Sequence, residues 1–203
     1  MLRVLIIHGW LHSANRYVSI AERLSKYADV TLYEYGRHFL KSICQLEYYT
    51  KCLQEHLNKN VYDIILTHST GGRILLGTNY SSRYTILANT AYGGIRHLLL
   101  GLPMLTILLC LIKVLPRSIT YIPAKMIAGI TMGKVNLFDA IMYSDIKRAN
   151  IVASIISAFE LSIDSFKRHG KLNSEVIIIR GSHDNIIPTR NTLELAKDLG
   201  INK

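Results

Sequence analysis

The sequence predicts an α/β fold, with a doubly wound, mostly parallel sheet, on two observations. Short apolar runs rich in β-branched residues alternate with segments whose apolar residues recur at helical spacing. Several runs, such as residues 4–7 and 176–179, are continuously apolar, which is typical of strands buried on both faces of a parallel sheet. Alternating strands and helices imply right-handed crossovers, so the strands should end at one common edge.

The same patterns predict the order of the elements. Strands are expected at residues 4–7, 29–33, 61–67, 84–91 and 176–179. Helices are expected from Ser13 or Asn15 to about residue 27, over about 40–58, directly after Ser69, and over 192–200. The first helix should bury Val18, Ile20, Ala21 and Leu24, and the second Ile43, Leu46, Leu53 and Leu57, with Cys44 and Cys52 beside them and His56 exposed.

Composition limits the classes of function. The chain has 203 residues, of which 49% are hydrophobic and 19% charged, as in a globular domain with a full core. Its net charge of +10 suits anionic substrates or an anionic membrane surface. Nucleic acid is disfavoured because the basic residues are scattered and no zinc-finger or RNA-binding signature occurs. The three cysteines lack metal-ligand spacing, so we expect no metal or other cofactor and a reducing, cytoplasmic compartment.

The chain is organised around residues 61–76. An apolar run ends at His68, the small residues Ser69, Thr70, Gly71 and Gly72 follow, and a second apolar segment begins at once. This order predicts a strand, a tight turn and a helix, with glycines where bulk would collide with neighbouring backbone. Ser69 at the apex would lie over the N-terminus of the helix, which favours a developing negative charge. The turn is therefore a candidate site for a nucleophile.

The run from Thr67 to Gly71 resembles the G-x-S-x-G nucleophile elbow of the α/β-hydrolases, with Thr67 in place of the first glycine. Taken alone, the run is equally compatible with an ordinary polar loop, and its position in the chain must decide. The resemblance implies an α/β-hydrolase fold with Ser69 as the nucleophile. His68 and Gly71 would support the turn.

Two further segments stand in the family's order. His8, Gly9 and Trp10 follow the first strand and resemble the family's His-Gly-x turn. The resemblance implies an oxyanion hole made by the backbone N–H groups of Trp10 and Thr70, with Gly9 in the turn and His8 as a bracing residue.

The second segment follows the strand at 176–179. Residues 181–188 resemble the family's Gly-x-x-Asp-x-x-x-Pro loop. Asp184 would then be the triad acid, which orients the catalytic histidine. His183 beside it is expected to be structural.

The sheet pattern stops over residues 93–169, which we expect to form a helical lid inserted between core segments 1–92 and 170–203. Residues 98–112 are the most hydrophobic part, interrupted by Gly101 and Pro103 and shorter than the roughly 20 residues needed to span a bilayer. By the resemblance, the inner face of the lid would line an acyl pocket. Contact of this apolar segment with an anionic membrane surface is an open alternative. His97 and His169 are expected to be solvated.

The resemblance implies a serine hydrolase acting on an ester, thioester or other acyl bond of a small hydrophobic substrate. In the family a strand and a Gly-His carrying the triad histidine follow the helix at 192–200, and the 203 residues contain neither. Either a histidine from elsewhere serves as the base, or the chain is truncated, nearly inactive and prone to self-association. The alternative function is a catalytically incomplete protein that binds acyl ligands or a membrane surface.

Overall fold

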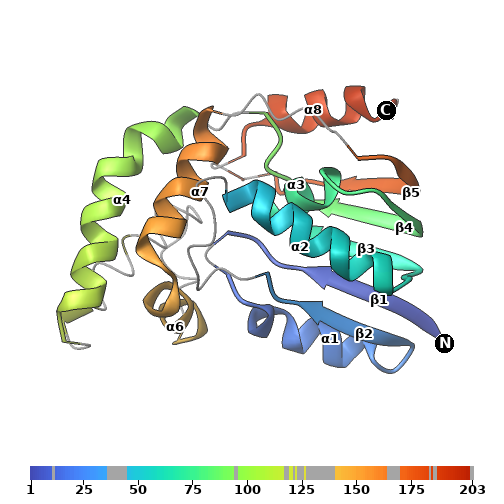
Figure 1. Ribbon diagram of the computed structural model, residues 1–203, viewed down its shortest axis with the longest axis horizontal. Coiled ribbons are helices and arrows are strands. Elements are labelled where there is room, and N and C mark those ends of the chain that lie inside the picture. The colour runs from blue at the N-terminus through green and yellow to red at the C-terminus, as the bar shows by residue number, and fades with distance from the viewer. Residues whose placement is uncertain are drawn as a thin grey trace.

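The computed structural model describes residues 1–10, 12–35, 45–93, 96–116, 119, 120, 122, 126, 140–163, 170–182, 184 and 187–201. Its described strands form one parallel sheet in the order β2-β1-β3-β4-β5. Their bounds are β1 Leu2–Ile7, β2 Ala28–Tyr33, β3 Ile64–His68, β4 Tyr80–Ala88 and β5 Leu172–Ile179. The α/β class and the parallel sheet predicted from the sequence are confirmed (Figure 1).

The inner strand β1, which lies between β2 and β3, is buried on both faces. Leu5 and Ile7 belong to the larger core, which α2 (Gln45–Lys59) and α3 (Thr70–Leu76) cover. Val4 and Ile6 point the other way and pack with Ala28. Successive side chains of a strand alternate between the two faces, so a continuously apolar run serves two cores at once.

The first helical segment differs from the prediction. It begins as a 3₁₀ turn, η1 (Ala14–Tyr17), continues as α1 (Val18–Leu24) and ends three residues earlier than expected. Val18 and Ile20, which we expected to be buried, are exposed. Residues two positions apart do not share one side of an α-helix. Tyr17 and Leu24, seven positions apart and therefore on the same side, pack on the sheet instead.

Three other expectations need correction or lie outside the described residues. His56 is not a free surface histidine, since its Nε2 lies 2.8 Å from the Tyr62 hydroxyl. Helix α2 buries Leu46 and Leu53 as predicted, whereas Ile43 and Cys44 are not among the described residues. Strand β4 begins four residues earlier than predicted. It also ends three residues earlier, because Asn89 takes a φ of 45° and turns the chain out of the sheet.

Helices α4 (Arg96–Val114), α6 (Ala140–Arg148) and α7 (Ile151–Ile163) lie beyond the carboxyl ends of the strands (Figure 1). They share a second core that contains Leu109, Ile112 and Ile146. Helix α4 continues through Pro103, where we expected an interruption, since apolar burial on one side of the helix outweighs the lost backbone hydrogen bond. None of the helices in the described part of the chain is both long and apolar enough to cross a membrane.

Helix α8 (Thr189–Asp198) closes the described part of the chain. It begins three residues earlier than predicted and buries Leu195 in the larger core. Gly200, expected to end this helix, has a φ of 68°, the left-handed conformation that glycine adopts without steric cost.

Candidate functional site

Ser69 occupies the junction between β3 and α3 in a conformation that non-glycine residues rarely adopt. Its φ is 53° and its ψ is −119°. The backbone is fixed on both sides: Ser69 N donates to Ala88 O at 2.9 Å, and Ser69 O accepts from Gly72 N at 3.1 Å. The side chain makes no capping hydrogen bond to the helix. The turn therefore holds the hydroxyl away from the helix backbone, at a strain of roughly 1–3 kcal/mol.

The loop after β1 packs directly against this turn. A Cβ atom added to Gly71 would lie 2.5 Å from His8 O and 2.8 Å from Ile7 O. Only glycine allows the first turn of α3 to approach the end of β1 so closely. We predicted that small residues follow Ser69 for steric reasons, and the contact of Gly71 with the backbone of Ile7 and His8 is that reason.

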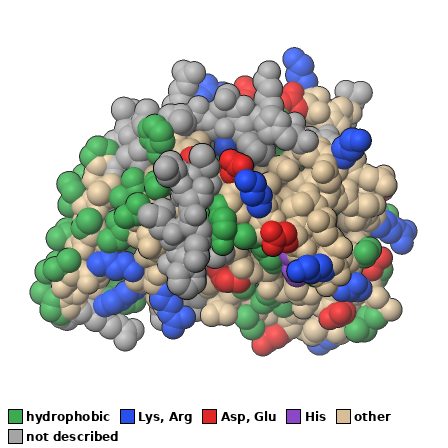
Figure 2. Space-filling view, viewed as in Figure 1, with side chains coloured by type: hydrophobic (Ala, Val, Ile, Leu, Met, Phe, Trp, Pro, Cys, Tyr) green, Lys and Arg blue, Asp and Glu red, His purple; other side chains and the backbone are tan. Residues whose placement is uncertain are grey.

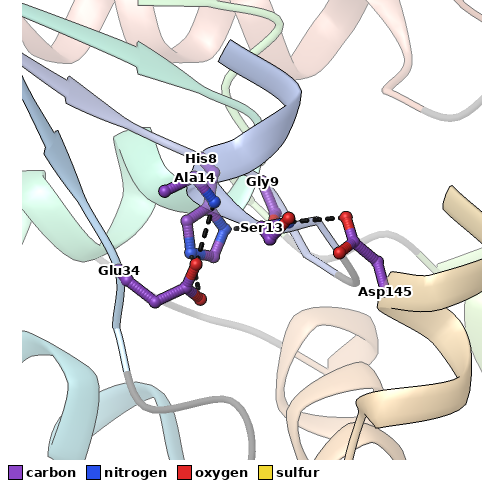
Figure 3. A network of polar contacts seen from close by, with 6 residues as sticks. All are labelled: His8, Gly9, Ser13, Ala14, Glu34 and Asp145. Atoms are coloured by element: carbon purple, nitrogen blue, oxygen red, sulfur yellow. Dashed lines mark hydrogen bonds and ion pairs between the residues drawn. The ribbon is translucent and has the colours of Figure 1, made fainter. Parts of the chain in front are cut away.

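His8 braces that loop from a buried position. Its Nδ1 lies 2.9 Å from Gly9 O, and its Nε2 lies 3.0 Å from Glu34 Oε1. The other carboxylate oxygen of Glu34 accepts from Ala14 N at 2.8 Å (Figure 3). The ring also stacks on Tyr35, with centroids 4.1 Å apart. His8 therefore links the loop after β1 to the residue that follows β2.

Two hydrogen bonds join the same loop to the helices beyond the sheet. Trp10 Nε1 donates to Ser157 Oγ of α7 at 3.0 Å. Ser13 N donates to Asp145 Oδ2 of α6 at 2.8 Å (Figure 3). The indole of Trp10 packs against both the larger core and the core of α4, α6 and α7. The positions of Trp10 and Ser13 thus depend on α6 and α7.

His68, the last residue of β3, lies beside Ser69 and next to Gly9 of the loop after β1. A Cβ atom at Gly9 would lie 2.8 Å from His68 Nδ1 and 3.1 Å from Ser69 Cβ, so the two side chains border the same point. The ring stacks on His12 at a centroid distance of 5.5 Å. His68 Nδ1 is enclosed and has no hydrogen-bond partner in the described part of the chain.

Burial lowers the pKa of His68 from its ordinary value of 6.5 to about 4, and the Asp184 carboxylate opposes this shift. His68 is therefore neutral at physiological pH. The opposing effect places Asp184 within electrostatic range of the residue that precedes Ser69.

Asp184 lies in the loop that follows β5. Asp184 N donates to Gly181 O at 3.2 Å, and Asp184 Oδ1 accepts from Ile187 N at 3.0 Å. Asn89 anchors the loop through Asn89 Oδ1, which accepts from Gly181 N at 2.8 Å. The structure thus brings Ser69, His68 and Asp184 to one edge of the sheet.

Other histidines that the sequence singled out cannot be placed. His183 and His169 lie outside the described residues, as does the side chain of His97. Among the described residues, no hydrogen bond joins a histidine to the Ser69 hydroxyl. No group of three or more His, Cys, Asp or Glu side chains in the described ranges is arranged to hold a metal ion.

Sequence reasoning missed the roles of four residues that organise the site. Glu34, Asp145, Ser157 and Asn89 hold the loops around Ser69. The conformation of Asn89 could have been predicted, because asparagine directly after an apolar strand readily takes a positive φ.

Comparison with known proteins supports the fold. No protein-family model and no curated protein sequence matches the chain. The solved structure of an enol-lactonase from Burkholderia xenovorans is similar, with a TM-score of 0.68 and 14% identity over 97% of this chain and 79% of that one. An alpha/beta hydrolase fold protein from Burkholderia ambifaria has a TM-score of 0.64 and 18% identity over 97% of this chain and 78% of that one. MenH from S. aureus has a TM-score of 0.60 and 12% identity over 98% of this chain and 93% of that one.

Sheet order, the strand-turn-helix at Ser69 and these similarities agree: the chain has the α/β-hydrolase fold.

Proposed function

We propose that this protein is a serine hydrolase in which Ser69 attacks the acyl carbonyl of an ester or thioester. The observation that carries the proposal is the strained conformation of Ser69, with a φ of 53° at the end of a central strand. Strain of this kind persists where a fold over-determines it, and it is concentrated at functional sites. Here the backbone bonds to Ala88 and Gly72 supply that constraint.

The proposed oxyanion hole consists of the backbone N–H groups of Trp10 and Thr70. Thr70 is the first residue of α3, and the first N–H groups of a helix have no partner within the helix. The dipole of a helix also favours negative charge at this end. A developing oxyanion beside Ser69 would be stabilised there in the transition state more than the neutral carbonyl is in the ground state.

Asp184 is the proposed triad acid. Its carboxylate lies on the loop after β5, at the same edge of the sheet as Ser69, and acts electrostatically on His68. A hydrolase of this type needs a neutral imidazole to accept the serine proton and return it to the leaving group. The acid would orient that imidazole and stabilise its cationic form.

The proposed substrate carries a hydrophobic acyl group, and helices α4, α6 and α7 would act as a lid. Support comes from the apolar core that these helices share with Trp10, next to the Ser69 turn. The similar structures include an enol-lactonase and carboxylesterases, and both names denote hydrolysis at an acyl group. Octanoyl nitrophenyl esters should then be cleaved faster than acetyl esters, and equal rates would contradict the acyl pocket.

A second candidate function is binding of acyl ligands without turnover. It is favoured by the absence, among the described residues, of a hydrogen bond between a histidine and the Ser69 hydroxyl. Without such a base the serine hydroxyl is a weak nucleophile, and only residual catalysis of about 10³–10⁴-fold over water remains. The fold alone does not decide between the two functions.

Labelling with a fluorophosphonate probe distinguishes the hydrolase function from binding without turnover. The hydrolase proposal expects covalent labelling of the wild type, none of Ser69→Ala, and unchanged labelling of Ser25→Ala, which alters an exposed serine at the end of α1. Absence of labelling together with saturable binding of a fluorescent fatty acid would establish the second function. Absence of both would overturn both candidates.

A further inference from the structure

Helix α4 is apolar on its outer side as well as on its inner side. Its inner side chains Leu108, Leu109 and Ile112 are buried in the core with α6 and α7. Four apolar side chains on the outside are exposed, namely Met104 (51%), Ile107 (58%), Leu111 (38%) and Val114 (81%). We call these four residues the outer stripe.

The spacing of the outer stripe places it on one face. Its members follow one another at intervals of three, four and three residues, which matches the helical period. An ordinary surface helix carries polar residues on its outer face, so a helix that is apolar all round is normally covered. Something outside the chain is therefore expected to contact this face.

More exposed apolar side chains follow α4 in the sequence. Ile119, Ile122 and Met126 are all exposed. Figure 2 shows hydrophobic side chains gathered over the part of the molecule that α4 occupies in Figure 1, with Lys and Arg side chains beside them. Exposed apolar surface of this extent is a mark of an interaction site rather than of an ordinary monomer surface.

Positive charge borders the outer stripe at its C-terminal end. Lys113 lies on α4 next to Val114, and its ammonium group donates a hydrogen bond to the backbone carbonyl of Lys147 at the end of α6. Lys147 and its neighbour Arg148 are exposed. Burial and the nearby charge of Lys147 both lower the pKa of Lys113. An anionic partner would relieve this repulsion, whereas a cationic one would increase it.

We propose that the outer stripe and its basic border, Lys113, Lys147 and Arg148, dock on the surface of an anionic lipid bilayer. Helix α4 would lie in the plane of the interface, with its apolar side chains among the acyl chains and the basic groups at the lipid phosphates. A second copy of the chain fits less well. It would bring its own net charge of +10, and like charges across an interface oppose association.

This docking does not depend on catalysis by Ser69. Its consequence for the proposed function is that the helices beside Ser69 would face the bilayer, the phase in which acyl chains are concentrated. The two proposals can fail separately, because Ser69→Ala should bind vesicles as the wild type does.

Cosedimentation of the 203-residue protein with vesicles tests the docking surface. The protein is expected to bind phosphatidylglycerol–phosphatidylcholine vesicles and to bind pure phosphatidylcholine much less, with affinity falling as salt is raised. Ile107→Glu combined with Leu111→Glu should weaken binding more than about tenfold. Lys113→Gln and Lys147→Gln should each weaken it about fivefold.

Two control variants carry the same kinds of substitution at the amino ends of the strands, far from the outer stripe. Val61→Glu alters an exposed apolar residue before β3, and Lys26→Gln an exposed lysine before β2, so both should bind vesicles normally. Circular dichroism checks that every variant is folded. Failure of the wild type to bind anionic vesicles, or equal binding by the stripe variants, would overturn the proposal. Dimerisation that the stripe variants abolish, without vesicle binding, would assign the surface to a second copy.

Discussion

Trp10 Nε1 donates to Ser157 Oγ at 3.0 Å, joining residues that are 147 positions apart in the sequence. Ser157 Oγ in turn donates to Ala153 O at 2.7 Å within α7. The indole is therefore held by a hydroxyl whose own orientation is fixed by helix backbone. Because Trp10 also carries a proposed oxyanion donor, the position of α7 and the shape of the site are coupled.

A double-mutant cycle measures this coupling. Trp10→Phe removes the indole N–H and keeps an aromatic ring, and Ser157→Ala removes the acceptor. We expect a coupling free energy of about 1 kcal/mol between the two changes in urea unfolding, the usual contribution of one hydrogen bond. Ser154→Ala, one turn earlier on α7, is the control and should be additive with Trp10→Phe. Additivity of the first pair would show that the hydrogen bond does not connect the loop to α7.

Relief of strain at Ser69 gives a second prediction. Ser69→Gly should raise the free energy of unfolding by about 1 kcal/mol, since glycine adopts a φ of 53° without the clash of a Cβ atom. Ser69→Ala keeps the Cβ atom and should gain little. Both variants should lose fluorophosphonate labelling. Equal stability of the glycine and alanine variants would mean that the turn is not strained.

The residues nearest to Ser69 in sequence were predictable, and those that hold the surrounding loops were not. Strands and the turn at Ser69 follow local rules of periodicity and small-residue placement, so their order was correctly predicted. Glu34, Asp145 and Ser157 reach the loop after β1 from distant parts of the chain. Only the packing of the helices decides such contacts.

The predicted burial and element boundaries were wrong where tertiary structure overrides local preference. Val18 and Ile20 were expected to be buried together with Ala21 and Leu24, but both are exposed, and Tyr17 and Leu24 face the sheet. Strand β4 begins at Tyr80, outside its most apolar run, since pairing with β5 extends it. The roles of Ser69 and Asp184 remain predictions that the experiments above test.

The close approach of Gly71 to β1 predicts a steric penalty. Gly71→Ala would place a Cβ atom 2.5 Å from a backbone oxygen, and neither backbone can move without disturbing the sheet. We expect a loss of about 3 kcal/mol or more in the free energy of unfolding. Gly181→Ala is the matched control, because the nearest atom would lie at an ordinary 3.6 Å. Similar stability of the two variants would contradict the contact.

Stability should depend on pH through His68. Its pKa falls from 6.5 in the unfolded chain to about 4 in the folded protein, so between these values the unfolded state binds more protons. The contribution is complete above about pH 6.5 and is lost as the pH falls toward 4, with a maximum of about 3 kcal/mol. Urea unfolding measured at several pH values checks this. The free energy of unfolding of the wild type minus that of His68→Gln should rise with pH between about 4 and 6.5.

Asp184→Asn provides the complementary test. Removing the carboxylate removes the attraction that opposes the effect of burial, so the pKa of His68 should fall further. The pH range over which stability is lost would then extend below 4. A wild-type slope that persists in His68→Gln would assign the pH dependence to other groups.

The last prediction concerns the carboxylate that braces His8. Both oxygens of Glu34 are occupied, one by His8 Nε2 and the other by Ala14 N, and His8 Nδ1 faces the carbonyl of Gly9. Glu34→Gln supplies one acceptor and one donor in place of two acceptors, so this pair of contacts to His8 and Ala14 cannot be kept as it is. We expect a cost of about 1–2 kcal/mol in the free energy of unfolding, while Glu22→Gln, at an exposed position on α1, should change it little. Fluorophosphonate labelling should slow as well, because the same loop carries Trp10. Unchanged stability and unchanged labelling of Glu34→Gln would show that the loop after β1 keeps its conformation without this carboxylate.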